Sequence, residues 1–275
     1  MKKLIVLVLI ISSAIYSQAQ KEKIELNLSK GETYKLNITD VMSMNTPDNG
    51  QQNIVDIIFV YNMSCKVVDV QDSIYDIEMK IDSLSNKKKS NSKSDEINND
   101  KVISKMMEPI IGKVFNLKLS STGIVNQINI DSATLKVLPY TKKTIKEFFE
   151  MIPAIYTRSG VSIGEKWTAD MKSYFGFFPK IKTTYELKEA SNNYLIITGL
   201  ANYNGSDSQN KSIPDMTGVT STITSFIKIN KKTGWIIDAK INQKAKGPVS
   251  SKNDKEKTNV NNQMTVDLEI TFRDK

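Results

Sequence analysis

The strongest constraint on the fold is a two-residue alternation of apolar and polar side chains that continues through long parts of the chain. It runs through residues 54–70 and 74–84, where Ile77, Met79 and Ile81 share one parity. Successive side chains of a strand point to opposite faces, so this period predicts long strands with one buried and one solvated face. Such strands are typical of antiparallel sheets.

The same period recurs along most of the chain. Further strands are predicted at residues 33–44, 114–119, 124–130, 166–175, 181–189, 193–203, 218–229, 234–243 and 263–272. We therefore expect a mainly β protein of the α+β class, with a long curved antiparallel sheet or an open barrel of about ten strands.

Two stretches in the middle of the chain have helical spacing instead. The apolar residues of the first predict a helix over about residues 100–111, ended by Gly112. In the second, residues 131–153, Ile145, Phe148, Phe149 and Ile152 form one stripe. We expect two or three helices from this region to pack on the sheet.

A repeated motif, which we call the echo, bears on domain organisation. Gly31-Glu32-Thr33-Tyr34 and Gly164-Glu165-Lys166-Trp167 each place a turn glycine before an aromatic strand start. The echo predicts one β-rich domain over residues 20–275, built from two diverged halves, 24–130 and 160–272, that are joined by the helical segment 131–153. The alternative is chance similarity, because every hairpin needs turn glycines and favours strand aromatics.

The N-terminus has the pattern of a secretory signal. Lys2 and Lys3 precede the apolar run Leu4–Ile11, which is too short to span a bilayer, and small residues stand at Ser17 and Ala19. We expect a signal peptide over residues 1–19 and a mature protein that is soluble and either periplasmic or secreted. No later apolar stretch is long enough to make it an integral membrane protein.

Composition narrows the chemistry. The chain has no histidine, and its one cysteine, Cys65, lies in a strand-like alternation. A Ser-His-Asp triad, a His-ligated metal and an intrachain disulfide are therefore excluded for this chain alone. We expect no enzymatic activity, no cofactor, no metal site and a buried, inert thiol.

The net charge of +8 does not predict nucleic-acid binding. Two segments with few apolar residues, 85–105 and 244–262, each carry a net charge of +3, and without them and the signal the chain is formally neutral. We expect both segments to be mobile loops. A nucleic-acid surface would need basic residues fixed on one face, so no nucleic-acid partner is expected.

Acidic side chains gather in one stretch, at Asp72, Asp76, Glu78 and Asp82. Paired carboxylates could hydrolyse glycosides or hold calcium. These four, however, share the parity opposite to the apolar residues, which favours a solvated strand face.

Other residues are candidates for binding or modification. The cluster around Phe177 and Phe178 could line the mouth of a cavity, or else plug the end of the core. Three Asp-Ser-apolar triplets make Ser73, Ser83 and Ser132 candidate O-glycosylation sites, although a turn or helix cap explains each of them without a sugar.

Several short motifs carry a family resemblance: Gly164-Glu165-Lys166-Trp167, Phe177-Phe178-Pro179, Lys232-Thr233-Gly234-Trp235 and the opening Lys30-Gly31-Glu32-Thr33-Tyr34. The chain resembles, over about residues 24–272, an uncharacterised family of secreted bacterial proteins with a domain of unknown function. The resemblance implies an exported β-rich domain and assigns no catalytic residue. The chain departs from the family pattern chiefly in its lysine-rich loops.

The sequence as a whole predicts an exported, non-enzymatic envelope protein that binds a lipid or another apolar ligand in a concave β scaffold. The candidate ligand-binding residues are Trp167, Phe177, Phe178, Met106 and Met107. Two alternatives stay open: a structural or protein-interaction component of the envelope, with an envelope protein as partner, and a carboxylate-based hydrolase.

Overall fold

The computed structural model describes residues 21–48, 51–91, 108–137, 141–150, 155–171, 181–205, 218–248 and 263–274. Its strands are β1 (Thr33–Asp48), β2 (Gln51–Gln71), β3 (Ile74–Ser90), β4 (Val114–Ser120), β5 (Val125–Asn129), β6 (Lys166–Met171), β7 (Ile181–Ala190), β8 (Tyr194–Asn204), β9 (Thr220–Asn230), β10 (Ile236–Pro248) and β11 (Gln263–Asp274). The predicted signal peptide, residues 1–19, lies outside the described residues.

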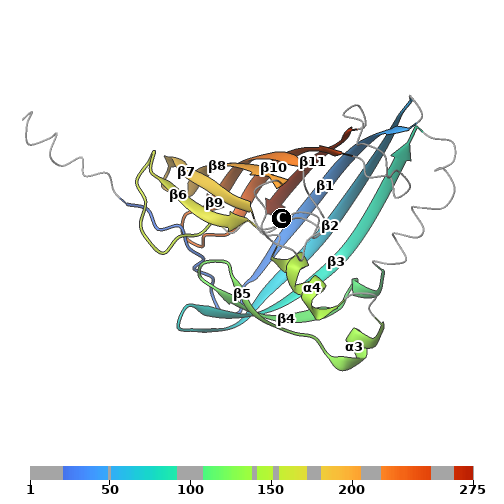
Figure 1. Cartoon of the computed structure of the whole chain (residues 1–275). Coiled ribbons are helices and arrows are strands. Elements are labelled where there is room, and N and C mark those ends of the chain that lie inside the picture. The colour runs from blue at the N-terminus through green and yellow to red at the C-terminus, as the bar shows by residue number, and fades with distance from the viewer. Residues whose placement is uncertain are drawn as a thin grey trace, which may run out of the picture.

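All eleven strands form one antiparallel sheet in the order β5-β4-β3-β2-β1-β11-β10-β9-β8-β7-β6. The first and last strands of the chain pair at its middle, with Leu36 opposite Asp274 at one end of the ladder and Asn45 opposite Thr265 at the other. Strands β5 and β6 are the two edges, so the sheet curves without closing into a barrel (Figure 1). The prediction of a mainly β, antiparallel sheet is confirmed.

Two segments that the sequence predicts to be loops begin as strand. Strand β3 continues to Ser90, which pairs with Val55, and β10 continues to Pro248, which pairs with Gln263. Main-chain ladders need no apolar side chains, so polar sequence here extends the sheet instead of ending it.

The prediction of two or three helices packed on the sheet is wrong for the described residues, because no helical layer covers the sheet there. The described helical parts are the 3-10 turn η2 (Glu108–Ile110) and the short helices α3 (Ser132–Val137) and α4 (Lys142–Phe149). Of these, α4 reaches the core through Phe149, whose ring lies 5.1 Å from that of Phe115.

A helix is expected over residues 100–111. Residues 100–107 lie outside the described residues, and the described remainder contains only η2. Pro109 disfavours helical geometry at the residue before it. Directly after η2, Ile111 forms a bridge with Ile81 of β3, and the Gly112 amide donates a 2.8 Å hydrogen bond to the Ile81 carbonyl. The segment around Ile111 therefore packs against β3 as irregular structure.

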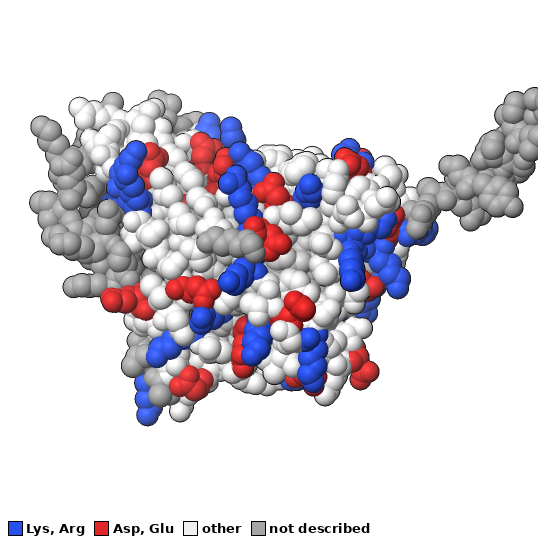
Figure 2. Space-filling model, turned by 180° about the vertical axis from the view of Figure 1, so that it is seen from behind, with Lys and Arg blue, Asp and Glu red and all other residues white. Residues whose placement is uncertain are grey.

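The two faces of the sheet differ as the alternation predicts. The inner face carries the buried side chains, which form one continuous apolar cluster with the segments that pack on it. The outer face carries cross-strand ion pairs, such as Lys118 with Asp76 at 2.7 Å and Lys240 with Glu269 at 2.8 Å. Figure 2 shows positive and negative side chains interspersed over the back of the molecule, as expected for a solvated face.

The turns that enter β1 and β6 have the same hydrogen bonds. In each, a glycine with positive φ donates to a later strand, and that strand's amide donates back to the glutamate after the glycine. The bonds are Gly31 to Val67, 2.8 Å, and Val67 to Glu32, 2.9 Å; then Gly164 to Leu187, 2.7 Å, and Leu187 to Glu165, 3.2 Å. These bonds agree with the echo in the sequence, and the division into two diverged halves stays a prediction.

Two extended segments, which we call the arms, precede these turns: residues 21–29 and 155–163. They pair with each other through reciprocal hydrogen bonds between Glu22 and Val161, at 2.7 and 2.9 Å. The Tyr156 hydroxyl donates to the Gly234 carbonyl at 3.0 Å, in the turn between β9 and β10. The arms therefore cover one end of the sheet, which we call the closed end.

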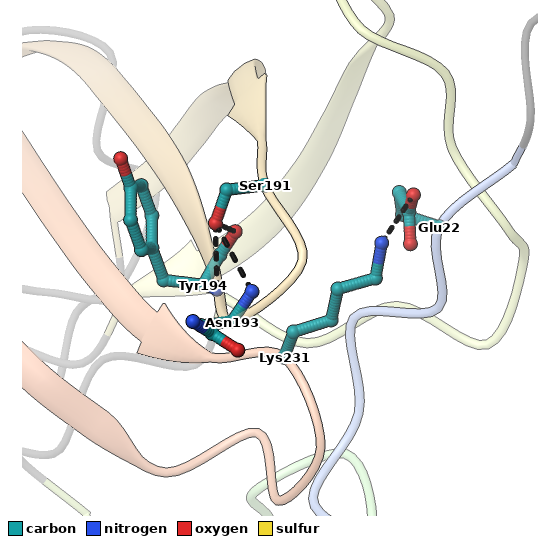
Figure 3. A network of polar contacts seen from close by, with 5 residues as sticks. All are labelled: Glu22, Ser191, Asn193, Tyr194 and Lys231. Atoms are coloured by element: carbon teal, nitrogen blue, oxygen red, sulfur yellow. Dashed lines mark hydrogen bonds and ion pairs between the residues drawn. The ribbon is translucent and has the colours of Figure 1, made fainter.

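An ion pair ties the first arm to the turns of β7–β8 and β9–β10 (Figure 3). Lys231 lies 2.8 Å from Glu22, and its own amide donates to the Asn193 carbonyl at 2.9 Å. The Ser191 hydroxyl accepts hydrogen bonds from the amides of Asn193 and Tyr194, which holds that turn in place.

Gly234→Ala should detach the first arm. A Cβ at this position would overlap the Glu25 carbonyl oxygen, which belongs to the backbone of the arm, and φ there is +68°. We expect a loss of about 2–4 kcal/mol in the free energy of unfolding, from the backbone clash and the left-handed φ together. Urea unfolding would measure the loss, and hydrogen exchange at the Leu26 and Asn27 amides would show the detachment.

Gly164→Ala is the matched control, because φ there is +84° but nothing lies within 4 Å of the added Cβ. It should cost only about 1–2 kcal/mol and leave the arm protected from exchange. Equal losses of unfolding free energy in the two variants would contradict the inference that the first arm packs against Gly234.

Candidate ligand-binding face

The inner face of the sheet carries a continuous apolar surface. Between Leu36 and Met44 of β1 it is formed by Leu36, Ile38, Met42 and Met44, with one polar exception, Asp40. The register of the neighbouring strands extends this surface across the sheet, because the buried residues of each strand stand opposite one another. A curved sheet with such a face can hold an apolar molecule against its concave side.

Burial decreases along the inner face in one direction. Leu36 and Ile38 are buried near the closed end, whereas Met42 and Met44 are half-buried. Strand β2 has the same trend and reaches a half-buried Val55. We call the end marked by Met44 and Val55 the open end, since it is the part of this face nearest to solvent on the central strands.

Asp40 interrupts the apolar face at its centre. Its side chain is 1% exposed, and its cross-strand neighbours are Phe59 on β2 and Ile270 on β11. No described residue gives either carboxyl oxygen a well-aligned hydrogen bond, although the Tyr61 hydroxyl lies near enough to lower the pKa in part. Burial outweighs that contribution and raises the pKa of Asp40 to about 7.

Further polar groups lie on the same face. Gln243 of β10 donates a 3.1 Å hydrogen bond to Ser221 of β9, and both side chains are buried. Lys88 of β3 stands opposite Ile57, on the inner side near the open end, and is half-buried. The inner face therefore combines an apolar floor with a few polar groups, the composition typical of small-molecule sites.

The ring of Tyr185 lies across Gly199 on the neighbouring strand. A Cβ at Gly199 would meet this ring at 2.7 Å and would also collide with the Ser225 hydroxyl. Burial raises the pKa of Tyr185 to about 12, which keeps its hydroxyl protonated.

Of the five predicted ligand-binding residues, only Trp167 belongs to the described part of the chain. It is half-buried on β6, packs beside Tyr185 and donates a 2.9 Å hydrogen bond to the Ile155 carbonyl of the second arm. Trp167 thus holds an arm to an edge strand. Phe177, Phe178, Met106 and Met107 lie outside the described residues.

The three candidate glycosylation sites are in different surroundings. Ser73 is exposed in the turn between β2 and β3, at a positive φ of 62°. Ser83 accepts a 2.7 Å hydrogen bond from Asn62 across the outer face. Ser132 is exposed at the first residue of α3, directly after Asp131, whose carboxylate accepts the Thr134 amide as a helix cap. Their modification stays a prediction.

The acidic residues Asp76, Glu78 and Asp82 lie on the outer side of β3, as their parity predicts, whereas Asp72 lies in the turn before β3, with φ 50°. Asp76 is paired with Lys118 at 2.7 Å and Asp82 with Lys80 at 2.8 Å. Within the described ranges, no group of three or more acidic or sulfur ligands is placed to hold a metal ion. Cys65 is buried on the inner side of β2, and burial raises the pKa of its thiol to about 12.

A shallow hollow of about 350 Å³ lies where β9, β10 and β11 run side by side. Lys244, Lys246 and Asp267 contribute to its lining. This polar lining suits water better than an apolar ligand, so the hollow is a less suitable site than the inner face.

Asp40 was not among the residues that the sequence singled out. Its parity is the signal that could have found it, because it alternates in step with Leu36, Ile38 and Met42. A carboxylate at a core position of a strand is costly and calls for a functional explanation.

Asp40→Asn should remove a pH dependence of stability. The carboxyl has a pKa of about 7 in the folded protein and about 4 in the unfolded chain, so the folded state holds a proton that the unfolded state has lost between these pH values. Relative to the variant, the wild-type free energy of unfolding should fall as the pH rises from about 4 to 7, by up to about 4 kcal/mol. Urea unfolding of both proteins across this range measures it, and parallel pH profiles would contradict it.

Comparisons with known proteins support the fold. A solved structure concerning lipid–protein interactions in lipovitellin is similar with a TM-score of 0.58 and 10% sequence identity, over 90% of this chain. The chain spans about a quarter of that protein, 25% of its length. An outer-membrane channel from Pseudomonas putida F1 matches over 91% of this chain and 97% of its own, with 8% identity, but its TM-score of 0.22 is too low to indicate a common fold.

No helix in the described ranges has the length and apolar character needed to cross a membrane.

The sequence comparisons give one family match. No protein with a curated description matches the sequence. Residues 133–236 match DUF6263, a family of unknown function, which confirms the predicted resemblance to a family without an assigned activity.

Proposed function

We propose that this chain is an exported, non-enzymatic envelope protein that binds a lipid or another apolar molecule on the inner face of its sheet. The observation that carries this proposal is the inner face itself. It is continuous and mostly apolar, is covered by the arms at one end, and becomes more exposed toward the other end along β1 and β2. The pattern favours a ligand that enters at the open end and lies along the strands.

The energetics suit such a ligand. Each methylene removed from water contributes about 0.8 kcal/mol, so about ten of them supply roughly 8 kcal/mol before the costs of association. Side chains such as Met42, Met44 and Val55 at the open end can provide this apolar contact. Methionine is suited to the task because its flexible thioether adapts to ligands of different shape.

The fold similarity adds support of a second kind. The lipovitellin structure is concerned with lipid–protein interactions, and this chain matches part of it over most of its own length. At 10% identity the likeness is one of architecture alone. It supports the proposal because a large curved sheet is one of the scaffolds in which proteins hold lipid.

The two alternatives have less support. A structural or protein-interaction component would be favoured by a flat apolar patch. On the described outer face the exposed Leu200 and Phe226 are diagonal neighbours, but each stands directly opposite a threonine of the adjacent strand, Thr224 and Thr198. A carboxylate-based hydrolase would need facing acidic groups in a cleft, whereas Asp76 and Asp82 are engaged in outer-face ion pairs.

Val55→Glu should weaken lipid binding. Val55 is half-buried on the inner side of β2 at the open end, and a carboxylate there would have to be desolvated beneath an apolar ligand. We expect the affinity for a fluorescent long-chain fatty-acid analogue to fall at least about tenfold, which corresponds to about 1.4 kcal/mol. Mass spectrometry of the protein purified from its native host would identify any lipid that it carries.

Ile54→Glu is the matched control. Ile54 adjoins Val55 on the same strand but is exposed on the outer face, so its replacement should leave the affinity unchanged. Equal effects of the two variants would contradict inner-face binding, and failure of the wild type to bind or carry any apolar molecule would overturn the proposed function.

A further inference from the structure

We infer that the inner face contains a head-group site, in which Asp40 accepts a hydrogen bond from a hydroxyl or amino group of the bound apolar molecule. The inference rests on the proposed function, because it requires a ligand on that face. It adds the chemical class of the ligand: an amphipathic molecule with a hydrogen-bond donor at one end.

The position of Asp40 differs from that of the other aspartates in the described sheet. Along β1 it lies between Ile38 and Met42, and across the sheet it faces Phe59 and Ile270. Aspartates of the outer face instead lie near lysines, as Asp76 does. An acidic group that served only the fold would belong among those ion pairs.

The carboxyl of Asp40 has unused hydrogen-bonding capacity. It offers about four acceptor positions, and the neighbouring Tyr61 hydroxyl can occupy only one of them. No described residue gives its two oxygens a well-aligned hydrogen bond. A buried carboxyl in this condition destabilises the fold, so its occurrence at the centre of the apolar face points to a partner that comes with the ligand.

The surroundings fix the orientation of the ligand. From Asp40 toward the closed end, Leu36 and Ile38 are already packed against the core. Toward the open end, Met42 and Met44 are half-buried, and about 14 Å of strand separates Asp40 from Met44. The donor group therefore lies innermost, at Asp40, and the apolar tail runs outward over the methionines.

Lys88 provides the competing arrangement. It lies on the inner side of β3 near the open end, where it could hold an anionic head group with the tail pointing inward. Asp40 is favoured because its side chain is almost fully buried, whereas that of Lys88 is half-buried and can reach solvent. The two arrangements predict opposite preferences for charge.

Competition with a fluorescent fatty-acid analogue at about pH 8 tests the inference, using hexadecylamine, hexadecanol and palmitate, which have equal chain length. The wild type should bind the amine and the alcohol at least about tenfold more tightly than palmitate. Asp40→Asn should remove most of this preference. Asp56→Asn, an aspartate on the outer side of the adjacent strand β2, should retain it.

Each other result has a definite meaning. Equal binding of the three compounds by the wild type would overturn the head-group site while leaving the proposed function standing. Preference for palmitate that is lost in Lys88→Gln would overturn it in favour of the lysine. Binding of none of them would overturn both proposals. The wild-type ranking decides the matter even if Asp40→Asn does not fold.

Discussion

The pairing of β1 with β11 is the interaction on which the rest of the structure depends. It joins strands from opposite ends of the chain along a ladder that runs from Leu36–Asp274 to Asn45–Thr265. Every other ladder of the sheet links strands that are consecutive in the sequence. Without this pairing, β1–β5 and β6–β11 would be separate meanders with two additional edges, and the inner face would be divided along its centre line.

Closing a loop of more than two hundred residues carries an entropic cost that must be met before the ladder forms. At the closed end the arms also join distant parts of the chain. Glu22 pairs with Val161, and Glu25 contacts Gly234. The β1–β11 ladder and the paired arms therefore both join parts of the chain that are far apart in the sequence.

Much of this fold can be read from local pattern, because the alternation that marks a strand is set by the geometry of the strand itself. Ile77, Met79 and Ile81 identify the inner side of β3 without knowledge of any partner. The order of the strands cannot be read in this way, because the β1–β11 pairing has no local signature. Of the helix expected at 100–111, the described residues form only the 3-10 turn Glu108–Ile110, where Pro109 and the contact of Gly112 with β3 outweigh apolar spacing.

The candidate site was less accessible to sequence reasoning than the fold. Trp167 attracted interest as an aromatic at a strand start, but its indole is bonded to the second arm. Parity alone places Asp40 on the inner side, whereas it would place Lys88 on the outer side, because the bulge opposite Asn62 and Met63 shifts the alternation of β3. Parity also gives the face that a residue occupies but not its distance from solvent along that face. That depth depends on which end of the sheet the arms cover.

The position of β5 and β6 at opposite edges of the described sheet bears on its curvature. In a closed barrel the strand number and stagger fix the radius, so the girth cannot change unless a ladder breaks. In the described part of the chain the two edges share no ladder, so this constraint on the radius does not apply to the sheet. The width of the concave side is therefore not fixed by strand number and stagger.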